Sequence, residues 1–255
     1  MKYLLTAFCA LLLFSCSKDD DKPTTQPLAS RTVIIYISGE NSLSSFAPDD
    51  LEEMTEASKL IDSKNHLVVF FDNASTSEMP YIAELKNGEV VKDTGLRFSE
   101  DFYASDPEKM REILTFIMQR YPAKSYGIDL WGHGSGWLIT NDSIATTKTA
   151  SRAYGIDNGE NRSYDRGKWI NIPSLAKVFS QLPQPFLFVM GDCCFFQCVE
   201  TAYELKDCTQ YIIGSPSEVP GDGAAYREVL PLAFSESADF YKDVIDKCEE
   251  FTIET

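Results

Sequence analysis

Two short segments of the sequence contain residues that could carry out covalent chemistry. In the first, His133 stands between Gly132 and Gly134. The flanking glycines leave no side chains in the way, so a ligand can approach the backbone and the Gly134 N–H can reach an oxyanion. An imidazole titrates near neutral pH and can move a proton in either direction. The second histidine, His66, begins an apolar run without polar company and is expected to be structural.

The second segment, Asp192-Cys193-Cys194, combines a carboxylate with two adjacent thiols. A thiolate is a strong nucleophile, and a nearby imidazole activates a thiol by taking its proton. Successive side chains of an extended chain point to opposite sides, so Asp192 and Cys194 share one side and Cys193 points to the other. We therefore expect Cys194 to react and Cys193 to be buried. Asp192 is expected to recognise a basic side chain of the substrate.

The same residues suggest two other kinds of chemistry, a serine hydrolase and a metal site. Ser135 lies in Gly-His-Gly-Ser-Gly and lacks the G-x-S-x-G frame of a serine hydrolase. Adjacent cysteines rarely satisfy one tetrahedral ion, and the chain has no C-x-x-C pair, so no metal site is predicted. The residues that such a site would use are Cys193, Cys194, Cys198 and His133.

The elements that position these segments alternate along the chain. Strands separated by helices favour an α/β fold with a mostly parallel sheet covered on both faces. In such a sheet, ligands bind outside the carboxyl ends of the strands, where both candidate segments fall. Strands are predicted at 32–38, 66–72, 124–131, 185–192 and 210–215, a hairpin at 81–92, helices at 43–61, 106–121, 173–182, 196–205, 225–234 and 240–251, and a loop or hairpin region at 139–168.

Composition and charge limit the class of protein. The chain has 255 residues, of which 44% are hydrophobic, and this excludes disorder, collagen and coiled coil as descriptions of its bulk. A single globular domain is the default at this length. With 39 acidic and 23 basic residues the formal net charge is −16, which would repel a phosphate backbone. Nucleic acid is therefore not expected as a partner.

The first residues predict export and lipidation. Lys2 precedes an apolar run at 3–14 that is too short to span a bilayer but typical of a signal peptide. Leu13-Phe14-Ser15-Cys16 resembles a bacterial lipobox, so residues 1–15 are expected to be removed and Cys16 to be acylated. The acidic and Pro/Thr-rich residues 16–31 are expected to form a tether.

The two candidate segments also carry a family resemblance. A strand followed by Gly-His-Gly, and a later strand followed by Asp-x-Cys, resemble the caspase-like fold of Cys–His endopeptidases, and the chain is most similar to the clostripain family. The resemblance covers about residues 32–235, the expected peptidase domain, and implies a three-layer α/β/α sandwich. It rests on TVIIYISGENSLSS, IDLWGHGSGW, MGDCCFFQCVE and IGSPSEVPGDGAAY.

The resemblance implies a role for each site residue. Cys194 would be the nucleophile and His133 the general acid/base, with the N–H groups of Gly134 and Cys194 as the oxyanion hole. Asp192 falls where the family has an acid in the primary specificity pocket, which implies cleavage of proteins or peptides after Arg or Lys. Members of the family usually have a small residue directly before the nucleophile, whereas this chain has Cys193 there.

Further implications concern activation, cofactors and location. Lys148 and Arg152 are candidate sites of activating internal cleavage. The residues themselves indicate no cofactor, and the resemblance to the clostripain family makes calcium a candidate. Residues 236–255 are expected to be a shortened C-terminal helical segment. The expected location is the outer membrane of a Gram-negative cell, reached through the lipid, with surface exposure left open. The alternative function is an inactive caspase-like surface lipoprotein that acts as a binding module.

Overall fold

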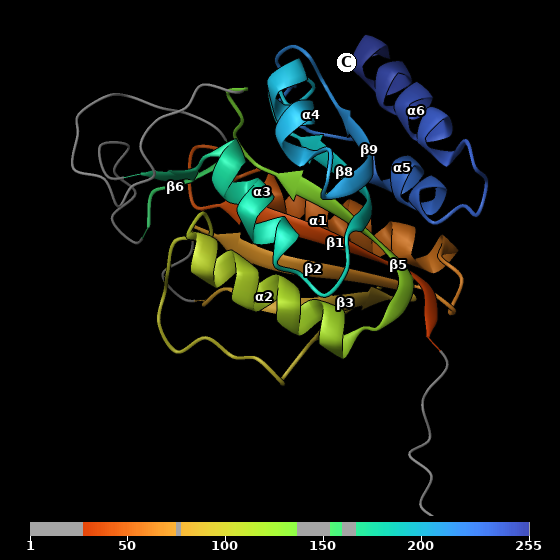
Figure 1. Cartoon of the computed structure of the whole chain (residues 1–255). Helices are drawn as coiled ribbons and strands as arrows, with labels where there is room; N and C mark the ends of the chain where they lie inside the picture. The colour runs from red at the N-terminus through yellow and green to blue at the C-terminus, as the bar shows by residue number, and fades with distance from the viewer. Residues whose placement is uncertain (1–27, 75–77, 137–153, 160–166, 255) are drawn as a thin grey trace, which may run out of the picture.

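A seven-stranded sheet forms the centre of the molecule (Figure 1). The computed structural model describes residues 28–74, 78–136, 154–159 and 167–254. Five of the strands are parallel to one another, as the continuous apolar runs in the sequence predict. Their order in the sheet is β4 (Glu89–Lys92), β3 (Tyr81–Lys86), β2 (His66–Asn73), β1 (Ala29–Gly39), β5 (Ala123–Trp131), β8 (Phe186–Asp192) and β9 (Thr209–Gly214).

The two antiparallel strands lie at one edge of the sheet. The β3–β4 hairpin turns at Asn87 and Gly88, whose φ angles of 53° and 82° are the positive pair that a two-residue hairpin turn needs. The predicted hairpin is therefore confirmed. β3 pairs antiparallel with β2, which joins the hairpin to the parallel part of the sheet.

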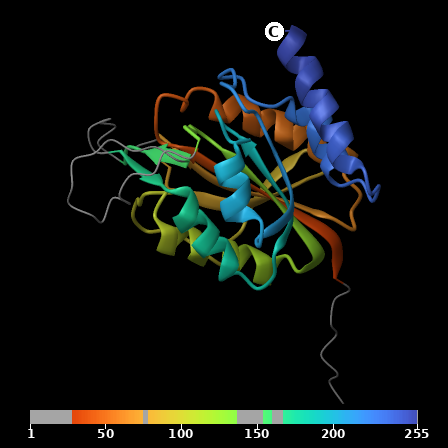
Figure 2. The same cartoon turned by 45° about the horizontal axis from the view of Figure 1, so that its top comes forward.

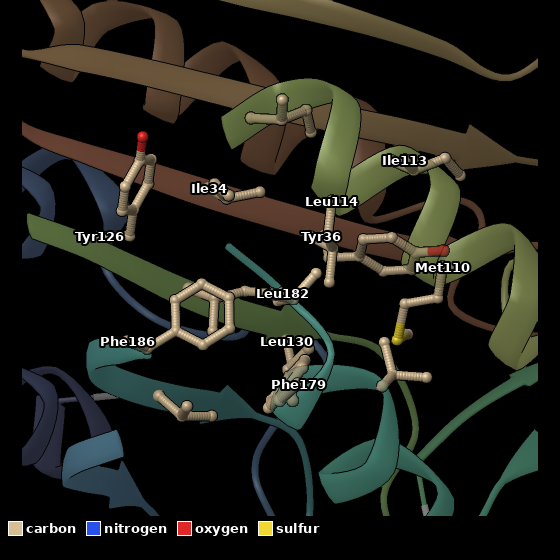
Figure 3. Packing of buried hydrophobic residues seen from close by; sticks show 14 of the residues in the cluster. Ile34, Tyr36, Met110, Ile113, Leu114, Tyr126, Leu130, Phe179, Leu182 and Phe186 are labelled. Atoms are coloured by element: carbon tan, nitrogen blue, oxygen red, sulfur yellow. The ribbon is translucent and has the colours of Figure 1, made fainter. Parts of the chain in front are cut away.

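Helices cover both faces of the sheet and complete the three-layer sandwich (Figure 2). Alternate residues of β1 supply the two cores: Ile34 and Tyr36 face one side, and Val33 and Ile35 the other. Figure 3 shows the first core, where Ile34 and Tyr36 pack with Met110 and neighbouring side chains. The first face is covered by α2 (Pro107–Arg120), α3 (Ile172–Ser180) and α4 (Val199–Leu205), and the second by α1 (Ala47–Ala57), α5 (Tyr226–Ala233) and α6 (Phe240–Glu254).

A small second sheet lies beside the carboxyl edge of the large one. It consists of β6 (Tyr154–Asp157) and β7 (Lys168–Ile170), which pair in antiparallel fashion. This pairing agrees with a hairpin, one of the two structures predicted for residues 139–168. The Tyr154 hydroxyl donates to the carbonyl oxygens of Tyr36 and Trp131, at 2.9 and 3.1 Å. β6 is thereby attached to the ends of β1 and β5.

Two predicted helices begin later than expected. The predicted helix at 43–61 begins at Ala47 and ends at Ala57, with a short 3₁₀ turn, η1 (Ser58–Leu60), after it. Pro48 lies in the first turn, where its missing N–H costs no hydrogen bond. The predicted helix at 196–205 begins only at Val199, because the N–H groups of Phe195 and Gln197 donate to the 215–217 segment.

The folded region extends beyond both predicted domain boundaries. Residues 29–31, assigned to the tether, belong to β1 and pair with β5. At the other end, Phe240 and Val244 of α6 are buried in the second core, so the predicted C-terminal helix packs as part of the same domain. Among the described residues, every helix is too short or too polar to cross a lipid bilayer.

Replacing Gly127 by alanine tests the packing of β5 on β8. A Cβ atom at Gly127 would lie 2.2 Å from the ring of Phe188, which packs at a tilt against the ring of Phe240. We expect Gly127→Ala to lower the free energy of unfolding by about 1–3 kcal/mol, because the ring must move in a close-packed core. Urea denaturation measures this, with exposed Lys124→Ala on the same strand as the control. An unchanged urea midpoint for Gly127→Ala would contradict the close packing of position 127 against the Phe188 ring.

Candidate active site

His133 follows β5 at the carboxyl edge of the sheet. Gly132, with a φ of +145°, turns the chain away from the strand, a conformation that a larger residue rarely adopts. The His133 Nε2 atom lies 2.9 Å from the hydroxyl oxygen of Ser42, and the His133 carbonyl accepts the Gly155 N–H at 2.8 Å. The imidazole is therefore held by the loop after β1, and its backbone by β6.

The surroundings of His133 favour its neutral form. The side chain is half-buried, and this burial lowers the pKa of the imidazole below its ordinary value. A neutral imidazole can accept a proton, so the ring is in the state that a general base requires.

The two thiols after β8 have different environments, as the alternation of side chains predicts. Cys193 is 2% exposed in the first core, and burial raises the pKa of its thiol well above the ordinary value. Cys194 is half-buried, and the Val219 N–H donates to its Sγ atom at 3.3 Å. A buried neutral thiol is a poor nucleophile, whereas the accessible Cys194 sulfur can meet a substrate.

The histidine segment and the cysteine segment are in direct contact. The Gly132 N–H donates to the Asp192 carbonyl at 3.3 Å, which extends the β5–β8 pairing by one step. A Cβ atom at Gly134 would lie 2.4 Å from the carbonyl oxygen of Cys194 and 2.9 Å from the Cys193 sulfur. Only glycine permits this approach. The structure thus brings the two predicted segments together at one edge of the sheet.

Asp192 lies in a cavity of about 440 Å³ next to this contact. It is 8% exposed and accepts the Ala224 N–H at 3.0 Å and the Tyr226 hydroxyl at 2.8 Å. Val219, which contacts the Cys194 sulfur, also lines the cavity. α6 also lines the cavity, through Ile245, Cys248 and Glu249.

A second buried carboxyl group, Asp129 on β5, was missed in the sequence. The Tyr226 hydroxyl lies 2.8 Å from one oxygen of Asp129 and 2.8 Å from one of Asp192. Burial raises the pKa of both carboxyl groups, and that of Asp129 rises well above its ordinary value. One hydroxyl has one proton and can donate it to only one of the two carboxyl groups at a time, and burial favours a proton on the other. The signal for this arrangement is an acid inside the apolar run Ile128-Asp129-Leu130.

Other predicted residues stand apart from the site. His66 begins β2, at the opposite edge of the sheet, and its polar partner was not foreseen: Nδ1 lies 2.7 Å from a Glu84 carboxylate oxygen on β3. Its expected lack of polar company was wrong, because the neighbouring strand supplies the carboxylate. Cys16, Lys148 and Arg152 lie outside the described residues. Ser42 was missed, although it follows a predicted strand in the polar segment Gly-Glu-Asn-Ser.

Comparison with known proteins identifies the family. The model of the clostripain family matches residues 35–252, so the chain belongs to this family. A secreted C11 cysteine protease from Bacteroides thetaiotaomicron, solved with an irreversible peptide inhibitor, is 34% identical and superimposes with a TM-score of 0.76. An inactive zymogen C11 protease from Parabacteroides distasonis is 28% identical, with a TM-score of 0.70. The predicted family and caspase-like fold are thereby confirmed.

The chain is shorter than these structures. Each match covers 89% of this chain and 59% of the solved chain. No curated protein matches the chain.

Below the site, Asp50 of α1 supports Trp131, the last residue of β5. The Trp131 indole N–H donates to Asp50 at 2.7 Å, and burial raises the pKa of this carboxyl to about 7. A carboxyl whose pKa is higher in the folded than in the unfolded state stabilises folding below its unfolded pKa. That contribution is lost as the pH rises through the folded pKa.

We therefore expect Asp50→Asn to remove part of the pH dependence of stability. Between about pH 4 and about pH 7, the free energy of unfolding of the wild type should fall relative to the variant by at least about 1 kcal/mol. Urea denaturation across this range measures the difference. Asp49→Asn, at the exposed neighbouring position, is the control. If the free energies of unfolding of the wild type and Asp50→Asn change with pH in parallel, the expectation is refuted.

Proposed function

We propose that this chain is a cysteine endopeptidase that uses Cys194 as nucleophile and His133 as general acid/base. One observation carries the proposal: the backbone of Gly134 packs on that of Cys194, so the histidine and cysteine segments lie side by side. Family membership supports the same reaction class. The neutral imidazole and the half-buried thiol supply the two groups that acyl transfer to sulfur needs.

The reaction proceeds through a thioester. The Cys194 thiol gives its proton to His133, and the sulfur forms a bond to the carbonyl carbon of the substrate. The carbonyl oxygen becomes an oxyanion and accepts hydrogen bonds from the N–H groups of Gly134 and Cys194. His133 then protonates the amine as the C–N bond breaks. In the second half, His133 takes a proton from water, whose oxygen attacks the thioester and releases the acid and the thiol.

Ser42 acts as a positioning residue in this scheme. Its hydroxyl lies 2.9 Å from His133 Nε2, which leaves Nδ1 as the ring nitrogen that we assign to proton transfer. A hydrogen bond to one ring nitrogen sets which nitrogen carries the proton and fixes the orientation of the ring.

We propose Asp192 as the group that selects Arg or Lys before the cleaved bond. Its carboxylate lines the cavity beside Val219, the residue that touches the Cys194 sulfur. The Ala224 N–H and the Tyr226 hydroxyl hold the carboxylate in place. A fixed carboxylate in a poorly solvated cavity binds a cation more strongly than one in water.

The remaining proposals concern location and activation. We propose residues 1–15 as signal peptide, followed by a tether that is lipidated at Cys16 and ends before β1. The peptidase domain then begins with β1 and includes α6. An extracytoplasmic site at the outer membrane follows, in line with the secreted relative. Lys148 and Arg152 stay candidates for internal cleavage, and peptides with basic residues are the proposed substrates.

Exchange of each adjacent cysteine tests the assignment of the nucleophile. We expect Cys194→Ala to reduce hydrolysis of fluorogenic Arg and Lys peptides by at least about 1,000-fold, because the covalent route is lost. Cys193→Ala should retain activity within about 10-fold, since the Cys193 thiol is buried and neutral. Intact mass after treatment with an arginyl chloromethyl ketone should show one adduct, on Cys194.

The opposite pattern, in which only Cys193→Ala loses hydrolysis activity, would identify Cys193 as the nucleophile. A folded wild type that hydrolyses no peptide and takes no label would instead favour the binding module.

Neutralising Asp192 tests the specificity assignment. We expect Asp192→Asn to lower kcat/KM for Arg and Lys peptides by about 100-fold, because a buried carboxylate facing a cation is worth about 2–5 kcal/mol. For peptides with a neutral residue before the cleaved bond, kcat/KM should fall by less than about 3-fold. Glu218→Gln, an exposed acid of the same cavity, is the matched control. A selective loss with Glu218→Gln in place of Asp192→Asn would transfer the role to Glu218.

A further inference from the structure

The residue directly after the proposed nucleophile, Phe195, combines an unusual backbone conformation with an exposed aromatic ring. Its φ angle is +58°, in the left-handed region that bulky residues rarely adopt. The other non-glycine residue with a positive φ in the described part of the chain, Asn87, lies in the hairpin turn that requires it. Phe195 instead lies in the connection from β8 to α4, and its side chain is 39% exposed.

Contacts on both sides of Phe195 hold this conformation. The Phe195 N–H donates to the Ser217 carbonyl at 2.8 Å. The next residue, Phe196, is 2% exposed and packs so closely on Gly191 that a Cβ atom there would lie 2.2 Å from its ring. Strained backbone that the surrounding structure enforces is typical of functional sites. Glycine would adopt the conformation without strain, so a phenylalanine at this position indicates a function of its exposed ring.

Phe195 lies against the segment that carries His133. A Cβ atom at Gly136, three residues after His133, would lie 3.5 Å from the Cβ atom of Phe195, which is ordinary van der Waals contact. The described residues that line the Asp192 cavity are 190–192, 213–220, 223–224 and three residues of α6, and Phe195 is not among them. The exposed ring is therefore separate from the cavity proposed for the residue before the cleaved bond.

The proton transfer to the leaving amine determines where the substrate residue after the cleaved bond must lie. His133 protonates the nitrogen of that residue, so the residue passes next to the histidine segment as it leaves. The substrate residue before the bond is directed away from it, into the Asp192 cavity. Phe195 follows the nucleophile directly and contacts the histidine segment, so its ring is within reach of the first side chain after the bond.

We propose that the ring of Phe195 binds the side chain of the substrate residue directly after the cleaved bond and selects apolar side chains there. This inference rests on the proposed peptidase function and adds a second determinant of specificity to it. An apolar side chain that covers the exposed ring removes apolar surface of both partners from water, which is favourable. A carboxylate at the same place would lose water without gaining a hydrogen bond from the ring.

Internally quenched peptides that differ only in the residue after a single Arg test this subsite. For the wild type, we expect kcat/KM to be at least about 10-fold higher with Leu or Phe at that position than with Asp or Gly, the discrimination that apolar contacts of this size provide. Phe195→Ala should lower kcat/KM for the Leu peptide by about 10-fold and reduce the preference to less than about 3-fold. Phe195→Leu, which keeps an apolar side chain, should retain most of the preference.

Two controls separate the subsite from damage to the rest of the active site. Tyr203→Ala removes another exposed aromatic side chain, on α4, and should keep the full preference of the wild type. An arginyl chloromethyl ketone reacts with Cys194 and has no residue after the reacting carbon, so it reports on the nucleophile and the Asp192 cavity without the proposed subsite. Its rate of labelling should therefore fall by less than about 3-fold in Phe195→Ala.

The inference is overturned if the wild type cleaves all the peptides equally well or prefers Asp, or if its apolar preference survives in Phe195→Ala. In these cases, hydrolysis and labelling of the wild type still support the peptidase. A wild type that neither hydrolyses the peptides nor takes the label overturns both proposals. Should Phe195→Ala fail to fold, Phe195→Asn takes its place with the same expected loss, because asparagine tolerates the left-handed conformation.

Discussion

The approach of the Gly134 backbone to the Cys194 carbonyl is the contact on which the site depends. β5 and β8 are neighbours in a parallel sheet, so the segments after them leave the sheet at the same edge. A methyl group at position 134 would lie 2.4 Å from that carbonyl oxygen and would force the two segments apart. The sheet sets the direction of the two loops, and the missing side chain sets their separation.

Much of this arrangement follows from local sequence. Apolar runs predict the strands, and side-chain alternation correctly separates buried Cys193 from half-buried Cys194. α1 and α4 begin later than periodicity predicts, because Pro48 favours the first turn of α1 and because the N–H groups of Phe195 and Gln197 donate to a segment about 20 residues away. Such long-range hydrogen bonds have no signature in periodicity.

The residues that sequence reasoning missed share one property. Ser42 and Asp129 each take part in the site through partners on other elements, at separations of tens of residues. Asp129 and Asp192 form a buried pair of acids joined by Tyr226. Part of the chain's excess of acidic residues is therefore internal, where water screens charge least.

Because the Tyr226 hydroxyl contacts both Asp129 and Asp192, the binding of a cation in the cavity depends on pH. Asp129, Tyr226 and Asp192 hold their protons jointly, since one phenol bridges both carboxyl groups. A guanidinium or ammonium ion that enters the cavity favours ionisation of both carboxyl groups, while Tyr226 keeps its proton, and so promotes release of a proton to the solvent. The heat of binding a cationic ligand must then include the ionisation heat of the buffer, and calorimetry in buffers of different ionisation enthalpy would count the protons released.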